Sequence, residues 1–168
     1  MITKEQKGFT LIEILIVVAI IAILASVVLV GLGPTQKEGR DSRRISDLSE
    51  VQNALELYYN HCGNYPGPAS SPGNSCGAWS AMTPGSNAYY EDMKADVTGL
   101  TDVGVPQIPE DPTNAGSLVY VYETNSPNSY TLAATLEDTG NAVLKSDETT
   151  DPNGSLTCGK GGLYCLSL

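Results

Sequence analysis

The sequence has few of the side chains on which enzymes and nucleic-acid-binding proteins depend. Among 168 residues it contains one histidine, His61, and no phosphate-binding glycine motif. A single imidazole with no nucleophile or metal ligands arranged around it excludes most acid–base, nucleophilic and zinc chemistry. The chain has nine basic and nineteen acidic residues, a net charge of -10, and this acidity repels phosphate backbones. We therefore expect that the protein is not an enzyme, that it carries no cofactor apart from the calcium considered below, and that its bulk surface does not bind nucleic acid.

Charged residues are scarce, at 17% of the chain, and they are unevenly distributed. Residues 9–32 are nearly all apolar. Six of the nine basic residues lie before residue 45, and from residue 61 onward three lysines accompany twelve acidic residues. The length fits one domain. This order predicts a short basic start, an apolar segment, a mixed-charge helix and an acidic globular body.

The apolar segment, residues 9–32, is long enough to cross a membrane as a helix. At about 1.5 Å per residue it spans roughly 36 Å, against a bilayer core of roughly 30 Å. A cleaved secretory signal has a shorter apolar run of about 7–15 residues. A plain membrane anchor, oriented by Lys4 and Lys7 with its N-terminus inside, leaves Glu13 unexplained. A charge inside a bilayer costs on the order of 3 kcal/mol or more, so Glu13 needs a partner or a role.

A short motif stands where the basic leader meets the apolar segment. The hexapeptide Gly8-Phe9-Thr10-Leu11-Ile12-Glu13 resembles the prepilin signature of type IV pilins and type II secretion pseudopilins. The resemblance implies that a prepilin peptidase cuts between Gly8 and Phe9 and then methylates the new amine of Phe9. It also implies that Glu13 pairs with the positive N-terminus of a neighbouring subunit. Such a buried ion pair is better suited to fix the register between neighbouring subunits than to stabilise the filament.

The resemblance also implies a structural function. The first expectation is a subunit of a type IV pilus, or fimbrium, that serves cell adhesion, motility or DNA uptake. The second is a pseudopilin that forms a short periplasmic pseudopilus for protein export by a type II secretion system. Either subunit starts as a single-pass protein among the lipids of the cytoplasmic membrane, with its N-terminus inside and its head outside. The implied partners are the prepilin peptidase and methyltransferase, identical or related pilin subunits, and an inner-membrane assembly platform with its ATPase.

Glycines and Pro34 are predicted to end or kink the apolar helix, because glycine weakens a helix and proline removes a backbone donor. We therefore expect three parts. Residues 1–8 form the leader peptide, residues 9–33 the hydrophobic transmembrane and assembly helix, and residues 34–168 the extracytoplasmic globular domain.

A second, amphipathic helix is predicted for residues 36–59. Its apolar positions recur every three or four residues and form one stripe, which we expect to pack on a sheet: Ile45, Leu48, Val51, Leu55 and Tyr58. Acidic and basic residues are interleaved over residues 37–50 of this helix. This pattern is typical of a solvated face with minor support from pairs four residues apart, and the alternative is charge matching between subunits. The charged set is Lys37, Glu38, Arg40, Asp41, Arg43, Arg44, Asp47 and Glu50.

The globular body is predicted to contain a small antiparallel sheet. Residues 117–122, 129–136 and 142–145 are rich in β-branched or alternating apolar residues and are separated by turns. Residues 91–96 form either a short helix or part of a loop. The fold class is α+β and pilin-like, with a long N-terminal helix whose amphipathic second half packs on the sheet.

Four cysteines, Cys62, Cys76, Cys158 and Cys165, form an even set. Beyond the membrane the compartment is oxidising, so we expect disulfides rather than zinc, whose ligands would show a CxxC spacing. Three pairings are possible. Pairing the first with the second and the third with the fourth is favoured, because each pair flanks a glycine-rich loop with little core to hold it, and the second pair resembles the C-terminal disulfide loop of many type IV pilins.

Calcium is a further candidate ligand. The acidic stretch that contains Asp147, Asp151 and Asn153 loosely resembles a calcium loop, and major pseudopilins carry calcium in a C-terminal loop. It lacks the regular EF-hand spacing, so a solvated turn is the simpler interpretation.

Overall fold

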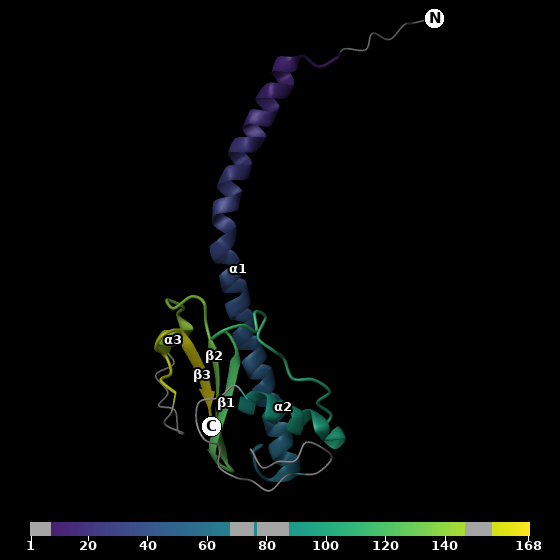
Figure 1. Cartoon of the computed structure of the whole chain (residues 1–168), viewed down its shortest axis with the longest axis vertical. Helices are drawn as coiled ribbons and strands as arrows, with labels where there is room; N and C mark the ends of the chain where they lie inside the picture. Colours follow the sequence, from purple (N-terminus) through teal and green to yellow (C-terminus); the bar gives the residue numbers. More distant parts are fainter. Residues whose placement is uncertain (1–7, 68–75, 77–87, 147–155) are drawn as a thin grey trace, which may run out of the picture. The chain divides into compact units, whose positions relative to one another are not determined.

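A computed structural model describes residues 8–67, 76, 88–146 and 156–168, and for residues 27–32 it gives the backbone alone. The chain divides into two compact units, Met1–Lys37 and Glu38–Leu168. The helix α1, Leu11–Cys62, contributes to both units, and every other helix and strand of the described residues lies in the second unit (Figure 1). We call this second unit the head.

The helix α1 runs without interruption through Pro34. Of the two predicted alternatives at this proline, an end or a kink, the helix end was therefore wrong. Residues 36–59 are helical as predicted, but they belong to the same helix as the apolar segment. A proline removes one backbone hydrogen bond of the helix and crowds the preceding turn. Helix propagation is cooperative, so the intact turns on both sides carry the helix across a single missing bond.

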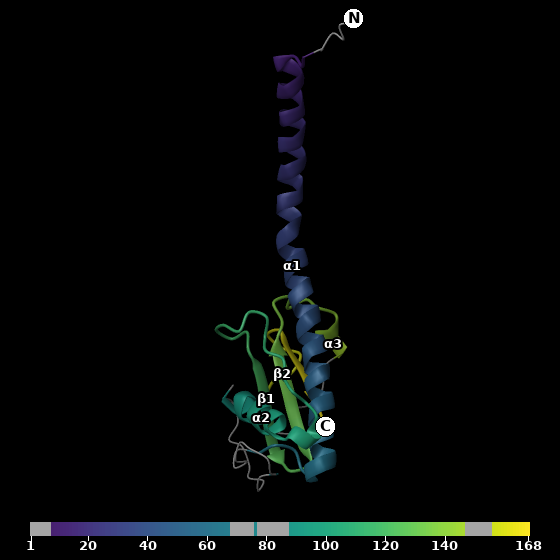
Figure 2. The same ribbon diagram turned by 90° about the vertical axis from the view of Figure 1, so that its right-hand side faces the viewer.

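The head part of α1 buries the predicted apolar stripe against the sheet, and Figures 1 and 2 show the two side by side. Leu48, Val51, Leu55 and Tyr58 are fully buried and belong to the hydrophobic core, and Ile45 packs against them in a partly buried position. The 3.6-residue period of the helix brings these side chains to one face. The predicted amphipathic pattern is confirmed.

The sheet contains three antiparallel strands in the order β1, β2, β3. Their bounds are Tyr120–Ser126, Ser129–Thr135 and Leu163–Ser167. The first two form the predicted hairpin, in which Tyr122 pairs with Leu132, but β1 begins three residues later than predicted and continues to Ser126. The strand β3 pairs with the other side of β2. The α+β, pilin-like fold class is confirmed.

The predicted third strand, residues 142–145, was wrong. These residues fall mainly in the short helix α3, Val143–Ser146. The side-chain Oδ1 of Asn141 accepts a hydrogen bond from the backbone N–H of Val143, and the carbonyl of Asn141 accepts one from Leu144. A short polar side chain that bonds the backbone two residues on favours a turn over a strand. The third strand of the sheet comes instead from the C-terminal end of the chain.

The helix α2, Ala88–Gly99, includes the stretch that the sequence left open between a short helix and a loop. Its core-facing residues Tyr90, Met93 and Val97 follow at intervals of three and four and are all buried. The 3₁₀ helix η1, Thr101–Val103, follows directly. Tyr90 packs edge-on against Tyr120, with ring centroids 5.6 Å apart, which joins α2 to β1.

Candidate functional site

The predicted cleavage position lies just outside α1. Gly8, Phe9 and Thr10 are exposed and have no regular secondary structure, and the helix begins at Leu11. The Phe9 side chain is 85% exposed. A peptidase needs an accessible bond in an extended segment, and the Gly8–Phe9 bond is accessible in the structure.

Thr10 and Glu13 form a capping box at the start of α1. The Glu13 carboxylate accepts hydrogen bonds from the Thr10 backbone N–H at 2.7 Å and from the Thr10 hydroxyl at 2.6 Å. The Glu13 N–H in turn lies 3.4 Å from the Thr10 Oγ1. This reciprocal arrangement satisfies backbone donors that have no partner within the first turn of a helix.

The capping box gives Glu13 a role within its own chain that the sequence analysis missed. The signal was present, because a threonine three residues before a glutamate at the start of an apolar run is the capping-box pattern. The predicted pairing of Glu13 with the N-terminus of a neighbouring subunit concerns a second chain and stays a prediction.

The apolar side chains that the structure describes in the first unit, up to residue 26, are exposed. The large apolar side chains described between Leu11 and Leu24 are half or more exposed. Among the residues that the structure describes, no helix has a stretch long and apolar enough to cross a membrane.

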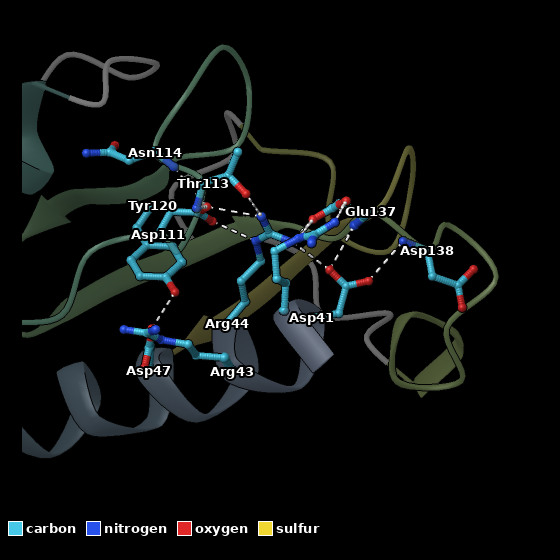
Figure 3. Close-up of polar contacts among 11 residues, drawn as sticks. Asp41, Arg43, Arg44, Asp47, Asp111, Thr113, Asn114, Tyr120, Glu137 and Asp138 are labelled. Carbon is cyan, nitrogen blue, oxygen red and sulfur yellow. Dashed lines mark hydrogen bonds and ion pairs between the residues drawn. The ribbon is translucent and has the colours of Figure 1, made fainter. Parts of the chain in front are cut away.

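The most elaborate polar arrangement of the head surrounds Arg44, which is fully buried (Figure 3). Its Nε and Nη2 donate to the two oxygens of Asp111, at 2.6 and 3.0 Å, and Nη2 also donates to the Thr113 hydroxyl at 3.0 Å. Its Nη1 donates to Asp41 at 2.8 Å and to Glu137 at 2.9 Å. These five bonds match the five N–H donors of a guanidinium.

The carboxylates around Arg44 are themselves held by further donors. Both oxygens of Glu137 accept from Arg40, at 2.6 and 2.7 Å. The buried Asp41 carboxylate accepts the backbone N–H groups of Glu137 and Asp138, each at 2.9 Å. We call the set of Arg40, Asp41, Arg44, Asp111 and Glu137 the arginine cluster.

The arginine cluster shifts the pKa values of several members in the direction that keeps them charged. Hydrogen bonds from Arg40 and then Arg44 lower the pKa of Glu137 to about 2, against the opposing effect of burial. Burial acts to raise the pKa of Asp111, but the hydrogen bond from Arg44 and those from backbone N–H groups outweigh it, so this pKa is also lowered. Burial acts to lower the pKa of Arg44, and its bonds to Asp111, Glu137 and Asp41 raise it overall.

The expectation that the charges of this helix form a solvated face was wrong for three residues. Asp47 is buried and accepts a hydrogen bond from Tyr120. The other two are Asp41 and Arg44. Both side chains are fully buried, and they have partners in segments 67 to 97 residues away. Lys37, Glu38 and Glu50 are exposed as expected, and Arg43 is exposed and lies 3.6 Å from Asp47, four residues on. Sequence spacing shows which charges share a helix face, and it gives no sign of the distant carboxylates that allow an arginine to be buried.

The four cysteines form two disulfides, Cys62–Cys76 and Cys158–Cys165. These are the pairs that the loop argument favoured. The first joins the C-terminal end of α1 to residue 76, and the second joins β3 to the turn before it. Together they use all four cysteines, so no free cysteine remains.

The calcium candidates Asp147, Asp151 and Asn153 lie outside the described residues. Within the parts of the chain that are described, no group of three or more histidine, cysteine, aspartate or glutamate residues could hold a metal ion. Calcium binding therefore stays a prediction.

Comparison with known proteins points to the N-terminal part of the chain. Residues 3–29 match the family described as the prokaryotic N-terminal methylation motif. No solved structure matches the chain.

Several curated proteins are similar over about a third of the chain. The type II secretion system core protein G of Escherichia coli (strain K12) is 38% identical over 64 residues, which is 38% of this chain and 44% of that protein. The protein of the same name from Aeromonas hydrophila is 35% identical over 63 residues, 38% of this chain and 44% of that protein. The type IV wide pilus major component PilA4 of Thermus thermophilus is 44% identical over 55 residues, 33% of this chain and 42% of that protein. The chain thus spans less than half the length of each of these relatives.

These matches and the fold agree with each other. A methylation motif precedes a long helix whose second part packs on a small antiparallel sheet with two disulfides. The chain has a pilin-like α+β fold and carries the prokaryotic N-terminal methylation motif, and about a third of it is similar to a type II secretion core protein G and to a type IV pilus component.

Proposed function

We propose that this chain is the structural subunit of a type IV pilus and has no enzymatic activity. The observation that carries the proposal is the methylation motif over residues 3–29, joined by one helix to a disulfide-closed α+β head. The similarity to a wide-pilus major component supports the pilus among the possible filaments. We expect such a surface filament to function in attachment, motility or DNA uptake.

The proposed pathway begins at the membrane. The apolar sequence of residues 9–32 holds the precursor in the cytoplasmic membrane, with the basic leader inside and the head outside. A prepilin peptidase removes residues 1–8 at the exposed Gly8–Phe9 bond and methylates Phe9. Extraction by an ATP-driven platform then stacks the apolar helices of related subunits, which replaces lipid contacts by helix contacts.

A second candidate function is that of a pseudopilin in a type II secretion system. It is favoured by the identity of 38% to a core protein G over a 64-residue match. The two candidates share processing and assembly, and they differ in the length and location of the filament. A pilus extends from the cell surface, whereas a pseudopilus is short and periplasmic.

Electron microscopy of cells with and without the gene tests the proposal. The expected result is long surface filaments that label with an antibody against the head and disappear in the deletion strain. Complementation with Glu13→Ala should leave the chain in the membrane without filaments, and Glu38→Ala, which changes an exposed glutamate of the same helix, should restore them. Normal filaments from Glu13→Ala would refute the assembly role of Glu13. Absence of surface filaments together with a secretion defect in the deletion strain would favour the pseudopilin.

A further inference from the structure

The head holds α1 by two different kinds of contact. Over Leu48, Val51, Leu55 and Tyr58 the contact is apolar and fully buried. Apolar burial is strong, but it has no preferred direction, so it keeps a helix on a sheet without fixing its position along the helix axis as firmly as directed bonds do. Apart from the disulfide at Cys62, the contacts best suited to resist axial movement of α1 are therefore the directed polar ones.

The polar contacts are concentrated where α1 enters the head. Residues 33–39 of α1 are all exposed, and Arg40, Asp41 and Arg44 then make the hydrogen bonds of the arginine cluster within little more than one turn. Farther along the helix the contacts are single hydrogen bonds: Asp47 accepts one from Tyr120, Glu56 accepts one from Tyr65, and Tyr59 donates one to Asn128. A force that enters α1 from its N-terminal side reaches the arginine cluster before any of these contacts.

The cluster joins α1 to two separate segments of the head. Asp111 belongs to the loop before β1, and it is itself fixed by the N–H groups of Thr113 and Asn114. Glu137 and Asp138 follow shortly after β2, the central strand of the sheet, and their backbone N–H groups bond to Asp41. Figure 3 shows Arg44 between these two segments. Force on the helix is thereby shared between the loop and the central strand.

Stability alone is a weak reason to bury such a cluster. Removing several charges from water costs free energy that their mutual attraction offsets only with near-ideal geometry, and apolar replacements of the same shape are often as stable. The best-attested use of buried ionic groups is to specify one register among several. The geometry here, with bidentate pairs that cross from the helix to two fixed segments, suits that use.

We propose that the arginine cluster is an axial lock, a positioning device that stops α1 from sliding along the head when the helix is pulled from its N-terminal side. Arg44 and Arg40 are its positioning residues. The lock gains its purpose from the proposed function, since in a filament built on the apolar helices any tension reaches each head through α1. The lock itself is a property of the single chain.

Single-molecule pulling of the full disulfide-bonded chain in detergent tests the lock. One handle is attached through an azide-bearing side chain at Gln36, just before the cluster, or at Asn60, near the other end of the helix; both positions are exposed. The second handle follows Leu168 in both cases, so the load on β3 is the same. Arg40→Gln, which removes one pair at the edge of the cluster, and Arg44→Lys, which keeps the charge but loses the bidentate bonds, are compared with the unaltered chain. Tyr65→Phe, at the far end of the contact, is the matched control.

The lock predicts that Arg40→Gln and Arg44→Lys lower the rupture force measured from Gln36 and leave the rupture force measured from Asn60 unchanged. Tyr65→Phe should leave the rupture force from Gln36 unchanged. An equal loss in both geometries would show a general loss of stability and would overturn the lock, as would no loss in either. If Arg44→Lys does not fold, Arg40→Gln decides the outcome alone, because its side chain is 36% exposed and lies at the edge of the cluster. The result does not depend on whether cells make filaments, so the lock and the proposed function can fail separately.

Discussion

Arg44 and Asp111 are 67 residues apart in the sequence and form a bidentate ion pair with both side chains fully buried. The pair joins α1 to the loop that precedes β1, so the two segments cannot separate without breaking both of its hydrogen bonds. Several properties of the head depend on this relationship.

Removal of the arginine should be far more costly than removal of its exposed neighbour. Arg44→Ala leaves Asp41, Asp111 and Glu137 without their shared partner and should lower the free energy of unfolding by about 3–5 kcal/mol. Arg43→Ala removes a side chain that is 63% exposed and should cost under about 1 kcal/mol. Urea unfolding followed by circular dichroism measures both. Similar losses for the two variants would contradict the described burial of Arg44.

Acid should destabilise the head through Glu137. Its pKa is lowered to about 2 in the folded chain from an ordinary 4.5, so the folded state favours the charged form. The stabilisation is complete above about pH 4.5 and is lost as the pH falls toward 2, because the unfolded chain then binds more protons. The lowered pKa of Asp111 acts in the same direction.

The measurement is the melting temperature between pH 6 and pH 2 for the unaltered chain and for Glu137→Gln. The variant should be less stable at pH 6 and should lose less stability on acidification. A pH profile for Glu137→Gln parallel to that of the unaltered chain would show that Glu137 does not contribute.

The disulfide Cys158–Cys165 should stabilise β3 more than the other two strands of the sheet. Replacing both cysteines by serine removes a short loop closure and should cost about 2–3 kcal/mol in the chain-entropy model. Because Cys165 lies in β3, amide hydrogen exchange should accelerate over residues 163–167 more than over β1. If amide exchange accelerated equally in all three strands, the disulfide would stabilise the whole head rather than β3 in particular.

Two glycines should respond to alanine in opposite ways. Gly162 has a φ of +86°, and an added Cβ would lie 2.8 Å from the carbonyl oxygen of Leu136, so Gly162→Ala should destabilise the head by about 1–3 kcal/mol. Gly39 lies in α1, and an added Cβ meets nothing within 4 Å, so Gly39→Ala should stabilise the helix by up to about 1 kcal/mol. Thermal unfolding of the two variants compares them directly.

The sequence predicted the features that depend on the spacing of neighbouring residues. The stripe from Ile45 to Tyr58 and the hairpin of β1 and β2 follow from periods of 3.6 and 2 residues, and the structure confirms both. The third strand was misplaced because residues 142–145 and 163–167 are both short apolar segments. A side-chain bond from Asn141 to the backbone, not hydrophobicity, decides between helix and strand at the first of them.

The arginine cluster could not be predicted in the same way. The charges of α1 alternate as on an exposed helix face, and two of the carboxylates that bury Arg44 come from Asp111 and Glu137, far away in the chain. The continuation of α1 through Pro34 was not predicted for a different reason. The cost of one proline is small beside the cooperative stability of a 52-residue helix. The capping box of Thr10 and Glu13, by contrast, was readable from spacing and was missed.

Intact-mass analysis of the sheared cell-surface fraction tests most directly whether the chain is processed at its N-terminus and incorporated into a surface filament. The membrane fraction serves as the control, and alkylation without prior reduction reports the state of the cysteines. We predict a sheared species that begins at Phe9, is about 14 Da heavier because of one methyl group, and has all four cysteines protected from alkylation. A chain that still begins at Met1, in cells that process other prepilins, would contradict processing at Gly8–Phe9 and with it the proposed filament subunit.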